Sequence, residues 1–237
     1  MKDIGPLVKI ISHDLRGPLG NLKNIVALFK TGELEMEQAK MFMEHVEVGV
    51  DRSLKLLDDL IEWSLASSDT KKVTKRVVNL SEVLSYVREK LIEDFTFKGV
   101  NLEINDAGAA LGFYDEAALR VVLKNLLSNA LHFTNSGGEV SVTVLEEGDD
   151  LIVAVKDSGI GVPEKMHETL FGMGKDNRRL GTNDEKGTGI GLFIVSDLVS
   201  RNNSRVWLDS TKEGGGSTFK FTVPKATETQ IQAVEDT

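Results

Sequence analysis

The chain has 237 residues, of which 41% are hydrophobic and 27% are charged, and its formal net charge is −9. This length suits two domains, and this composition excludes a largely disordered chain. The negative charge argues against a nucleic-acid partner, because phosphate contacts need a basic surface.

The chain contains no cysteine, which excludes disulfides and thiolate metal sites and favours a reducing, cytoplasmic compartment. No apolar run approaches the roughly 20 residues of a membrane span, and no signal peptide is recognisable. The first expected helix begins almost at residue 1, so we expect a piece of a longer protein whose sensor domain lies outside this chain. Membrane attachment of that longer protein is left open.

Two long helices are expected first, over about residues 6–30 and 35–65. In the first, the apolar residues follow the alternating three-and-four spacing of a coiled-coil seam. They are Val8, Ile11, Leu15, Leu22, Ile25 and Phe29, with Pro18 in the gap. The second carries a similar stripe of Met36, Met43, Val46, Val50, Leu54, Leu57 and Ile61. An antiparallel hairpin cannot bury both stripes by itself, so we expect a homodimer that forms a four-helix bundle.

The remaining segments predict an α/β domain. Residues 69–78 are polar and basic without a helical stripe, which makes them a linker. Asn79 and Glu82 resemble a capping box at the start of a helix, and Asp115 is expected to cap another. The expected helices are 79–97, 115–133 and 189–202, and the expected strands are 100–104, 140–144, 151–156, 205–208 and 218–223.

The predicted fold class is therefore α+β, a helical hairpin followed by an α/β sandwich. The expected domains are 1–68 for the hairpin, 69–78 for the linker and 79–225 for the α/β domain. Residues 226–237 are expected to lack regular structure.

One histidine stands out in the first helix. His13 lies two residues after Ile11 and two before Leu15, on the outward face, where a lone histidine is ordinarily just solvated. However, its segment reads Ser-His-Asp-Leu-Arg-Gly-Pro-Leu over residues 12–19. This resembles the H box of sensor histidine kinases. The resemblance implies that His13 attacks the γ-phosphate of ATP and that Asp14 orients its ring or takes its proton.

Gly17 departs from that motif, where many members of the family have Thr or Asn to position water for dephosphorylation of the partner. We therefore predict weak or absent phosphatase activity by that route.

Glycine-rich segments later in the chain extend the resemblance. Taken alone, each segment is equally consistent with a turn or with glycines that permit close packing of a helix. In order they resemble the N, D-x-G-x-G, F and later glycine boxes of the ATP-binding domain that histidine kinases share with gyrase and heat-shock chaperones. The matching segments are 125–130 (NLLSNA), 157–161 (DSGIG), 170–171 (LF), 187–192 (GTGIGL) and 214–219 (GGGSTF).

The resemblance implies roles for these residues with ATP and Mg²⁺ as cofactors. Asn125 and Asn129 share a helix face and could offer amide oxygens to Mg²⁺. Asp157 is expected to accept a hydrogen bond from the adenine amino group, with Gly159 and Gly161 letting the turn approach the base.

Further nucleotide contacts are expected around the phosphates and the base. The run at residues 187–192 opens a helix, where free N–H groups and the helix dipole favour a phosphate. The further cofactor-binding candidates are His132, Phe133, Gly187, Thr188, Gly189, Gly191, Leu192 and Thr218. His132 departs from the usual Lys, which predicts reduced nucleotide affinity unless another cation compensates. For Phe133 the alternative is equally good, because an aromatic residue at the end of an amphipathic helix is as often simply part of the hydrophobic core.

Residues 162–186 are expected to form a lid whose cations neutralise the transferred phosphoryl group. We favour Lys175 and one of the arginines at 178 and 179, with Arg178 taken as the candidate. A solvated charge cluster is an equally good interpretation.

The leading hypothesis is a histidine kinase that phosphorylates itself on His13 and passes the phosphoryl group to an aspartate in the receiver domain of a response regulator. A hydrolytic ATPase of the gyrase or chaperone kind and a non-catalytic dimeric scaffold are the alternatives.

Overall fold

The computed structural model describes residues 5–31, 36–67, 73–105, 108, 110–172, 179–182 and 187–235. Within them, side chains are described except at residues 5–15, 18, 36, 39, 45, 52, 67, 234 and 235. Internal contacts divide the chain into two units, Met1–Ile61 and Glu62–Thr237.

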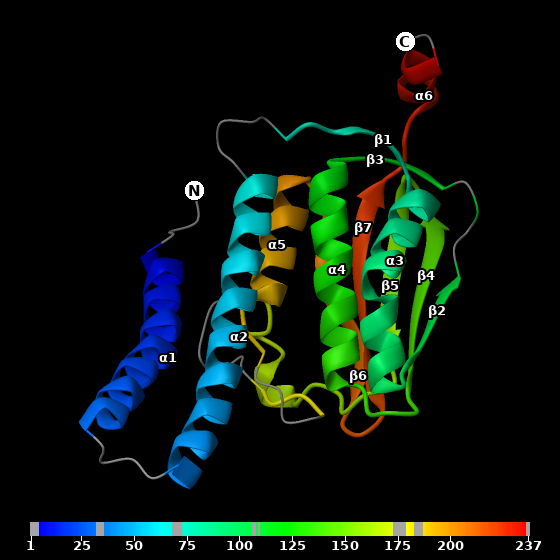
Figure 1. The fold of residues 1–237 in the computed structure, drawn as a ribbon. Helices are drawn as coiled ribbons and strands as arrows, with labels where there is room; N and C mark the ends of the chain where they lie inside the picture. The colour runs from blue at the N-terminus through cyan, green and yellow to red at the C-terminus, as the bar shows by residue number, and fades with distance from the viewer. Residues whose placement is uncertain are drawn as a thin grey trace. The chain divides into compact units, whose positions relative to one another are not determined.

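The first unit consists of two helices that run in opposite directions (Figure 1), α1 (Gly5–Thr31) and most of α2 (Met36–Ser67). The last six residues of α2, 62–67, are counted with the second unit. Both lie close to their predicted bounds. Four residues of the predicted α2 stripe stay about half-exposed: Met43 (59%), Leu54 (54%), Leu57 (44%) and Ile61 (49%). Of the helices described, none has a stretch long and apolar enough to span a bilayer.

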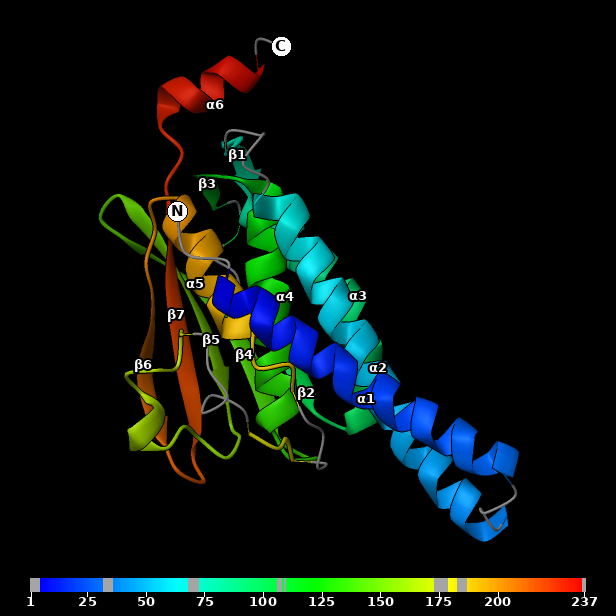
Figure 2. The same cartoon turned by 90° about the vertical axis from the view of Figure 1, so that its left-hand side faces the viewer.

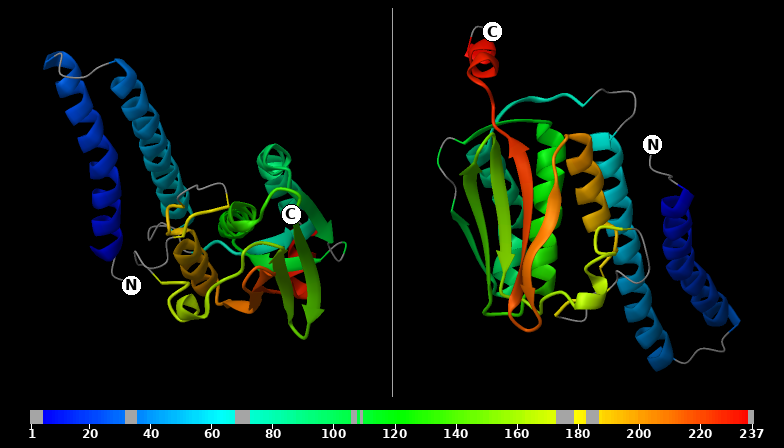
Figure 3. Two further views of the ribbon diagram at one scale, coloured as in Figure 1. Left: turned by 90° about the horizontal axis from the view of Figure 1, so that it is seen from below. Right: turned by 180° about the vertical axis from the view of Figure 1, so that it is seen from behind.

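The second unit is a two-layer α/β sandwich. Helices α3 (Leu80–Lys98), α4 (Glu116–Phe133) and α5 (Gly191–Arg201) cover one face of a five-stranded sheet (Figures 2 and 3). Its strands, in spatial order, are β2 (Asn101–Asn105), β4 (Glu139–Glu147), β5 (Asp150–Asp157), β7 (Gly216–Pro224) and β6 (Val206–Lys212). A short 3-10 helix, η1, spans Glu164–Met166. This architecture confirms the α+β prediction.

The sheet is mixed. β2 runs parallel to β4, and the other neighbouring strands are antiparallel. The predicted hairpin is confirmed, because Val142 of β4 pairs with Val155 of β5. Val140, Val142 and Val144 are at most 2% exposed, as alternation predicts for a strand with one face on the core.

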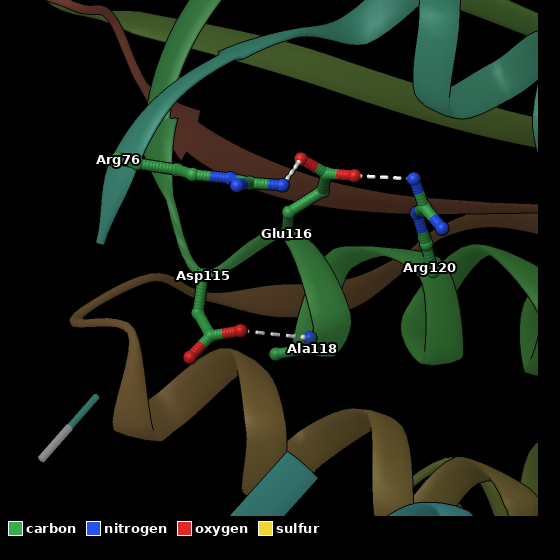
Figure 4. Close-up of polar contacts among 5 residues, drawn as sticks. All are labelled: Arg76, Asp115, Glu116, Ala118 and Arg120. Atoms are coloured by element: carbon green, nitrogen blue, oxygen red, sulfur yellow. Dashed lines mark hydrogen bonds and ion pairs between the residues drawn. The ribbon is translucent and has the colours of Figure 1, made fainter. Parts of the chain in front are cut away.

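α4 is the helix that positions most of the candidate site, and its start is set by local polar contacts (Figure 4). The Asp115 carboxylate caps the helix by accepting from the Ala118 N–H at 3.1 Å. Glu116 in the first turn pairs with both Arg76 and Arg120. Its negative charge suits the positive end of the helix dipole.

The buried stripe of α4 shows why this segment is helical. Its members recur at one-, three- and four-residue steps, the pattern of a helix face packed on a sheet. They are Ala118, Leu119, Val122, Leu123, Leu126, Leu127 and Ala130.

Two short strands were missed. β1 (Arg76–Asn79) pairs antiparallel with β3 (Leu111–Tyr114), so regular structure begins inside the segment predicted as linker. Four-residue strands are too short to carry a period-two signal. The Asn79 side chain accepts from the Ser81 N–H at 3.0 Å, which supports the predicted start of the helix that follows β1.

The expectation that the tail lacks regular structure is wrong for Glu228–Glu235, which forms α6. A reciprocal capping box starts this helix. The Thr227 N–H donates to Gln230 Oε1 at 2.9 Å, and the Gln230 N–H donates to Thr227 Oγ1 at 3.3 Å.

Candidate nucleotide site

A buried carboxylate ends strand β5. Asp157 is 6% exposed, and its Oδ1 accepts from the Gly159 N–H at 2.8 Å and the Ser217 N–H at 3.2 Å. No donor in the part of the chain that the structure describes contacts Oδ2. Burial raises the pKa of Asp157, and the two backbone hydrogen bonds partly oppose that rise. The site therefore holds one carboxylate oxygen ready for a donor on a ligand.

Two glycines allow the backbone to close around this carboxylate. A Cβ on Gly159 would come within 2.2 Å of the Phe133 carbonyl oxygen. A Cβ on Gly216, whose φ is +86°, would come within 1.9 Å of the Asp157 carbonyl oxygen. Glycine is required at both positions because no larger residue fits.

The Asp157 turn forms one wall of the candidate site. A second wall is formed by α4 together with the glycine run before α5. Gly191 lies against Asn125, since a Cβ on Gly191 would lie 2.9 Å from Asn125 Oδ1 and 3.7 Å from Asn129 Nδ2. A Cβ on Gly187 would lie 3.6 Å from His132 Nε2. One face of α4 therefore lies along residues 187–191.

The position of the Asn125 amide is set by a backbone contact. Its Nδ2 donates to the Val121 carbonyl at 2.8 Å, which leaves Oδ1 on the side of Gly191. An amide oxygen is a hard ligand of the kind that Mg²⁺ accepts. The described residues hold no cluster of three His, Cys, Asp or Glu side chains that could bind a metal instead. These donors fit a Mg²⁺ ion that is bound mainly by phosphates and water.

The start of α5 suits an anion. Ile190 precedes the helix and provides no side-chain cap for its first N–H groups. Thr188 is 7% exposed, and Gly189 has φ +74°. Leu192 is half-buried in the first turn. Uncapped N–H groups at the positive end of a helix attract phosphate.

Arg179, which the sequence left as the alternative to Arg178, lies at the candidate site. Its Nη1 donates to the Gly161 carbonyl at 2.6 Å, and its guanidinium lies 5.7 Å from the centre of the Phe133 ring. Burial lowers the pKa of Arg179, and the charge of Glu213 partly opposes this. The sequence offered two adjacent arginines at 178 and 179 with no signal to separate them.

Ser217 was also missed. It donates to Asp157, whereas the predicted Thr218 is half-buried one residue further along β7, where it pairs with Lys156. Side-chain alternation along the strand could not have found Ser217, because the donor is its backbone N–H, which any residue except proline would supply.

Four predicted residues cannot be placed against this site. The side chains of His13 and Asp14 lie outside the described residues, although their backbone belongs to α1. Lys175 and Arg178 also lie outside them.

Residues 114–227 match the family model described as "Histidine kinase-, DNA gyrase B-, and HSP90-like ATPase". The chain is 30% identical over 226 residues to phytochrome-like protein Cph1 of Synechocystis, an alignment that covers 94% of this chain and 29% of that protein. It is also 30% identical over 220 residues to the sensor histidine kinase WalK of Bacillus subtilis, covering 90% of this chain and 35% of WalK. The chain thus spans about a third of the length of these relatives.

The fold agrees with solved structures. Histidine kinase ThkA, solved in complex with response regulator protein TrrA, superposes with a TM-score of 0.70 at 19% identity, covering 94% of this chain and 62% of that one. This superposition shows the fold alone, whereas the family model and the relatives confirm the resemblance seen in the sequence motifs. Residues 114–227 therefore belong to the ATPase family that histidine kinases share with DNA gyrase B and HSP90, and they form the ATP-binding catalytic core of a chain that is similar to sensor histidine kinases over at least 90% of its length.

Proposed function

We propose that this chain binds ATP in the second unit and transfers its γ-phosphoryl group to His13. The observation that carries the proposal is the buried Asp157 carboxylate, which keeps Oδ2 for a ligand donor. The adenine amino group is such a donor. An ionised carboxylate accepts from it but has nothing to donate to the oxygen that guanine carries at the same position, so it selects adenine.

The phosphates would be held by residues 187–191 and by the α4 side chains that line them. The N–H groups at the start of α5 would bind phosphate oxygens, and the Asn125 and Asn129 amides would hold Mg²⁺ beside them. When bound, Mg²⁺ neutralises phosphate charge and orients the γ-phosphoryl group. His132 near Gly187 adds a polar ring to the same wall.

In the transfer step, an imidazole nitrogen of His13 attacks the γ-phosphorus, a nitrogen–phosphorus bond forms, and the bond to the bridging oxygen of ADP breaks. Asp14 would orient the ring and take its proton. The phosphoryl group would then pass to an aspartate of a response regulator receiver domain. The similarity in fold to ThkA, which was solved with a response regulator, supports that partner.

We further propose that the first unit dimerises. Leu54, Leu57 and Ile61 share the predicted α2 stripe and stay half-exposed within one chain. An exposed apolar stripe of this length on a helical hairpin is typical of a four-helix bundle formed by two copies.

The test uses ATP labelled on the γ-phosphate. The chain, incubated with this ATP and Mg²⁺, should take up label that is labile in acid, and chelation of Mg²⁺ should abolish the uptake. His13→Ala should lose the label. His45→Ala is the matched control, because it removes another histidine from the same hairpin, and it should label normally.

The other outcomes separate the alternatives. Label that survives His13→Ala would remove His13 from the proposal. Release of free phosphate without labelled protein would favour a hydrolytic ATPase, and no reaction at all would favour a scaffold.

A further inference from the structure

Every helix leaves its last four carbonyl groups without partners in its own ladder. At the end of α4 all four accept hydrogen bonds from donors beyond the helix, at 2.7 to 3.3 Å. The donors are Thr134 for Ala130 and Leu131, Thr182 for His132, and Ile160 for Phe133. Three separate segments of the chain therefore meet at this one turn.

Lys98 adds a charged donor from a fourth segment. It is the last residue of α3, and it is only 9% exposed. Its Nζ donates to the carbonyls of Leu131 at 2.9 Å and His132 at 3.0 Å. A cation in this place also balances the negative end of the α4 dipole.

The approach of Lys98 is fixed by the turn that follows it. Gly99 adopts φ +69°, which ends α3 and redirects the chain. The Gly99 carbonyl accepts from the Gly137 N–H at 2.8 Å, which ties this turn to the loop after α4. The side chain itself is almost fully buried, which leaves its ammonium group few alternative positions.

The turn that Lys98 contacts carries part of the candidate nucleotide site. The His132 ring faces Gly187, and Phe133 lies beneath Arg179. The Phe133 carbonyl accepts from the Ile160 N–H at 3.0 Å inside the Asp157 turn. A shift of this turn would therefore displace both walls of the site.

We propose that Lys98 is a positioning residue for the nucleotide: its ammonium group fixes the last turn of α4, and through it the Asp157 turn and the segment at Thr182. The inference rests on the proposed function for its kinetic consequence. A lysine is suited to the role because its three N–H donors can serve two carbonyl groups at once. Methionine has a similar length and no donor, whereas arginine keeps the charge and the donors.

The experiment compares Lys98→Met and Lys98→Arg in the full 237-residue chain. Lys98→Met should raise KM for ATP about tenfold with kcat nearly unchanged, a loss of about 1.4 kcal/mol that one charge-assisted hydrogen bond can account for. Lys98→Arg should recover most of this loss. Lys225→Met is the matched control, because the Lys225 ammonium group pairs with the exposed Glu146, and the KM of this variant for ATP should not change.

Hydrogen exchange on the nucleotide-free protein supplies a local readout. In Lys98→Met the amides of Ile160 and Thr182 should exchange faster, while the amide of Val153 in the centre of the sheet keeps its rate. This readout needs no ATP, so it still decides the role of Lys98 if the unmodified chain binds no nucleotide, a result that would count against the proposed function alone.

Either of two results would overturn the role of Lys98. One is unchanged exchange at Ile160 and Thr182. The other is a uniform acceleration that includes Val153, which would make Lys98 a general contributor to stability. If Lys98→Met does not fold, the same comparison is made with Lys98→Gln, which keeps a neutral donor and should show a smaller change of the same pattern.

Discussion

At the residue scale, burial of the Asp157 carboxylate disfavours its charged form, and the same carboxylate is the proposed acceptor for the adenine amino group. Replacement by Asn keeps an oxygen to accept from Gly159 and Ser217 but places an N–H₂ donor where the ligand donor should bind. We expect Asp157→Asn to weaken ATP binding roughly 10- to 100-fold, the loss of one hydrogen bond to a charged group. Discrimination between ATP and GTP should fall at the same time. Titration calorimetry with both nucleotides measures this.

Asp209→Asn is the control for that substitution, because Asp209 is exposed and pairs with Lys220 at 2.9 Å on β6 and β7. It should leave ATP affinity unchanged. Normal ATP affinity in Asp157→Asn would contradict the assigned role of the carboxylate.

The raised pKa of Asp157 predicts a pH dependence of stability. Burial raises the pKa in the folded state above the value in the unfolded chain, so the folded state holds the proton more tightly. This favourable contribution is full below the unfolded pKa and is lost as pH rises through the folded pKa. The unmodified chain should therefore gain stability relative to Asp157→Asn on acidification from neutral pH. Urea unfolding of the two proteins over a pH series measures the difference, and a difference of opposite sign would contradict it.

Acidification should act on ATP binding in the opposite sense. Protonation of Asp157 replaces an acceptor oxygen by a donor, so ATP affinity should fall at a higher pH than an exposed aspartate would require. Loss of affinity only in the range of an ordinary aspartate would speak against this carboxylate as the adenine acceptor.

Single residues were predictable where a motif names them. Asp157, Asn125 and the glycines at 187 and 191 could be selected as candidates because their spacing matches a family pattern. Lys98 was not, since its partners are backbone carbonyls more than 30 residues away along the chain, and no side-chain pattern marks them. Arg179 was passed over for a similar reason, because its main partner is the Gly161 carbonyl.

At the element scale, α4 depends on the cap that starts it. Asp115 accepts from the Ala118 N–H and also, through Oδ2, from the Thr74 N–H at 3.2 Å, so one side chain joins the helix to the segment before β1. Asp115→Ala should lower the free energy of unfolding of the second unit by about 1–2 kcal/mol, the range for a lost N-cap. Denaturant unfolding followed by circular dichroism measures the change.

Asp149→Ala serves as the control in that measurement, because Asp149 is exposed in the turn between β4 and β5. It should change the stability by less than about 0.5 kcal/mol, as is usual for a surface substitution. Equal stability of the two variants would show that Asp115 contributes nothing as a cap.

Long helices and strands were predicted well because their apolar residues recur with one period over many residues. α1, α2, α4 and the hairpin of β4 and β5 all carry such stripes. The strands β1 and β3 were not predicted, because each has only four residues and is stabilised by pairing with the other. α6 could have been found from Thr227 and Gln230, whose spacing is that of a capping box.

At the scale of the whole molecule, the proposed dimer should depend on the α2 stripe. Leu54→Glu places a charge within the stripe and should leave the chain largely monomeric at concentrations where the unmodified chain is a dimer. Val48→Glu is the control, because Val48 is 70% exposed and lies on the opposite side of α2 from Leu57. Light scattering coupled to size exclusion distinguishes these states. Two variants of equal mass in solution would contradict the proposed interface.

The proposed transfer of a phosphoryl group from ATP to His13 can be tested by locating the phosphoryl group on the chain. After incubation with ATP and Mg²⁺, the chain would be digested under alkaline conditions that preserve phosphohistidine and mapped by tandem mass spectrometry. We expect a phosphoryl group on His13 and none on the other three histidines. A phosphoryl group on any other residue, with His13 unmodified, would contradict it.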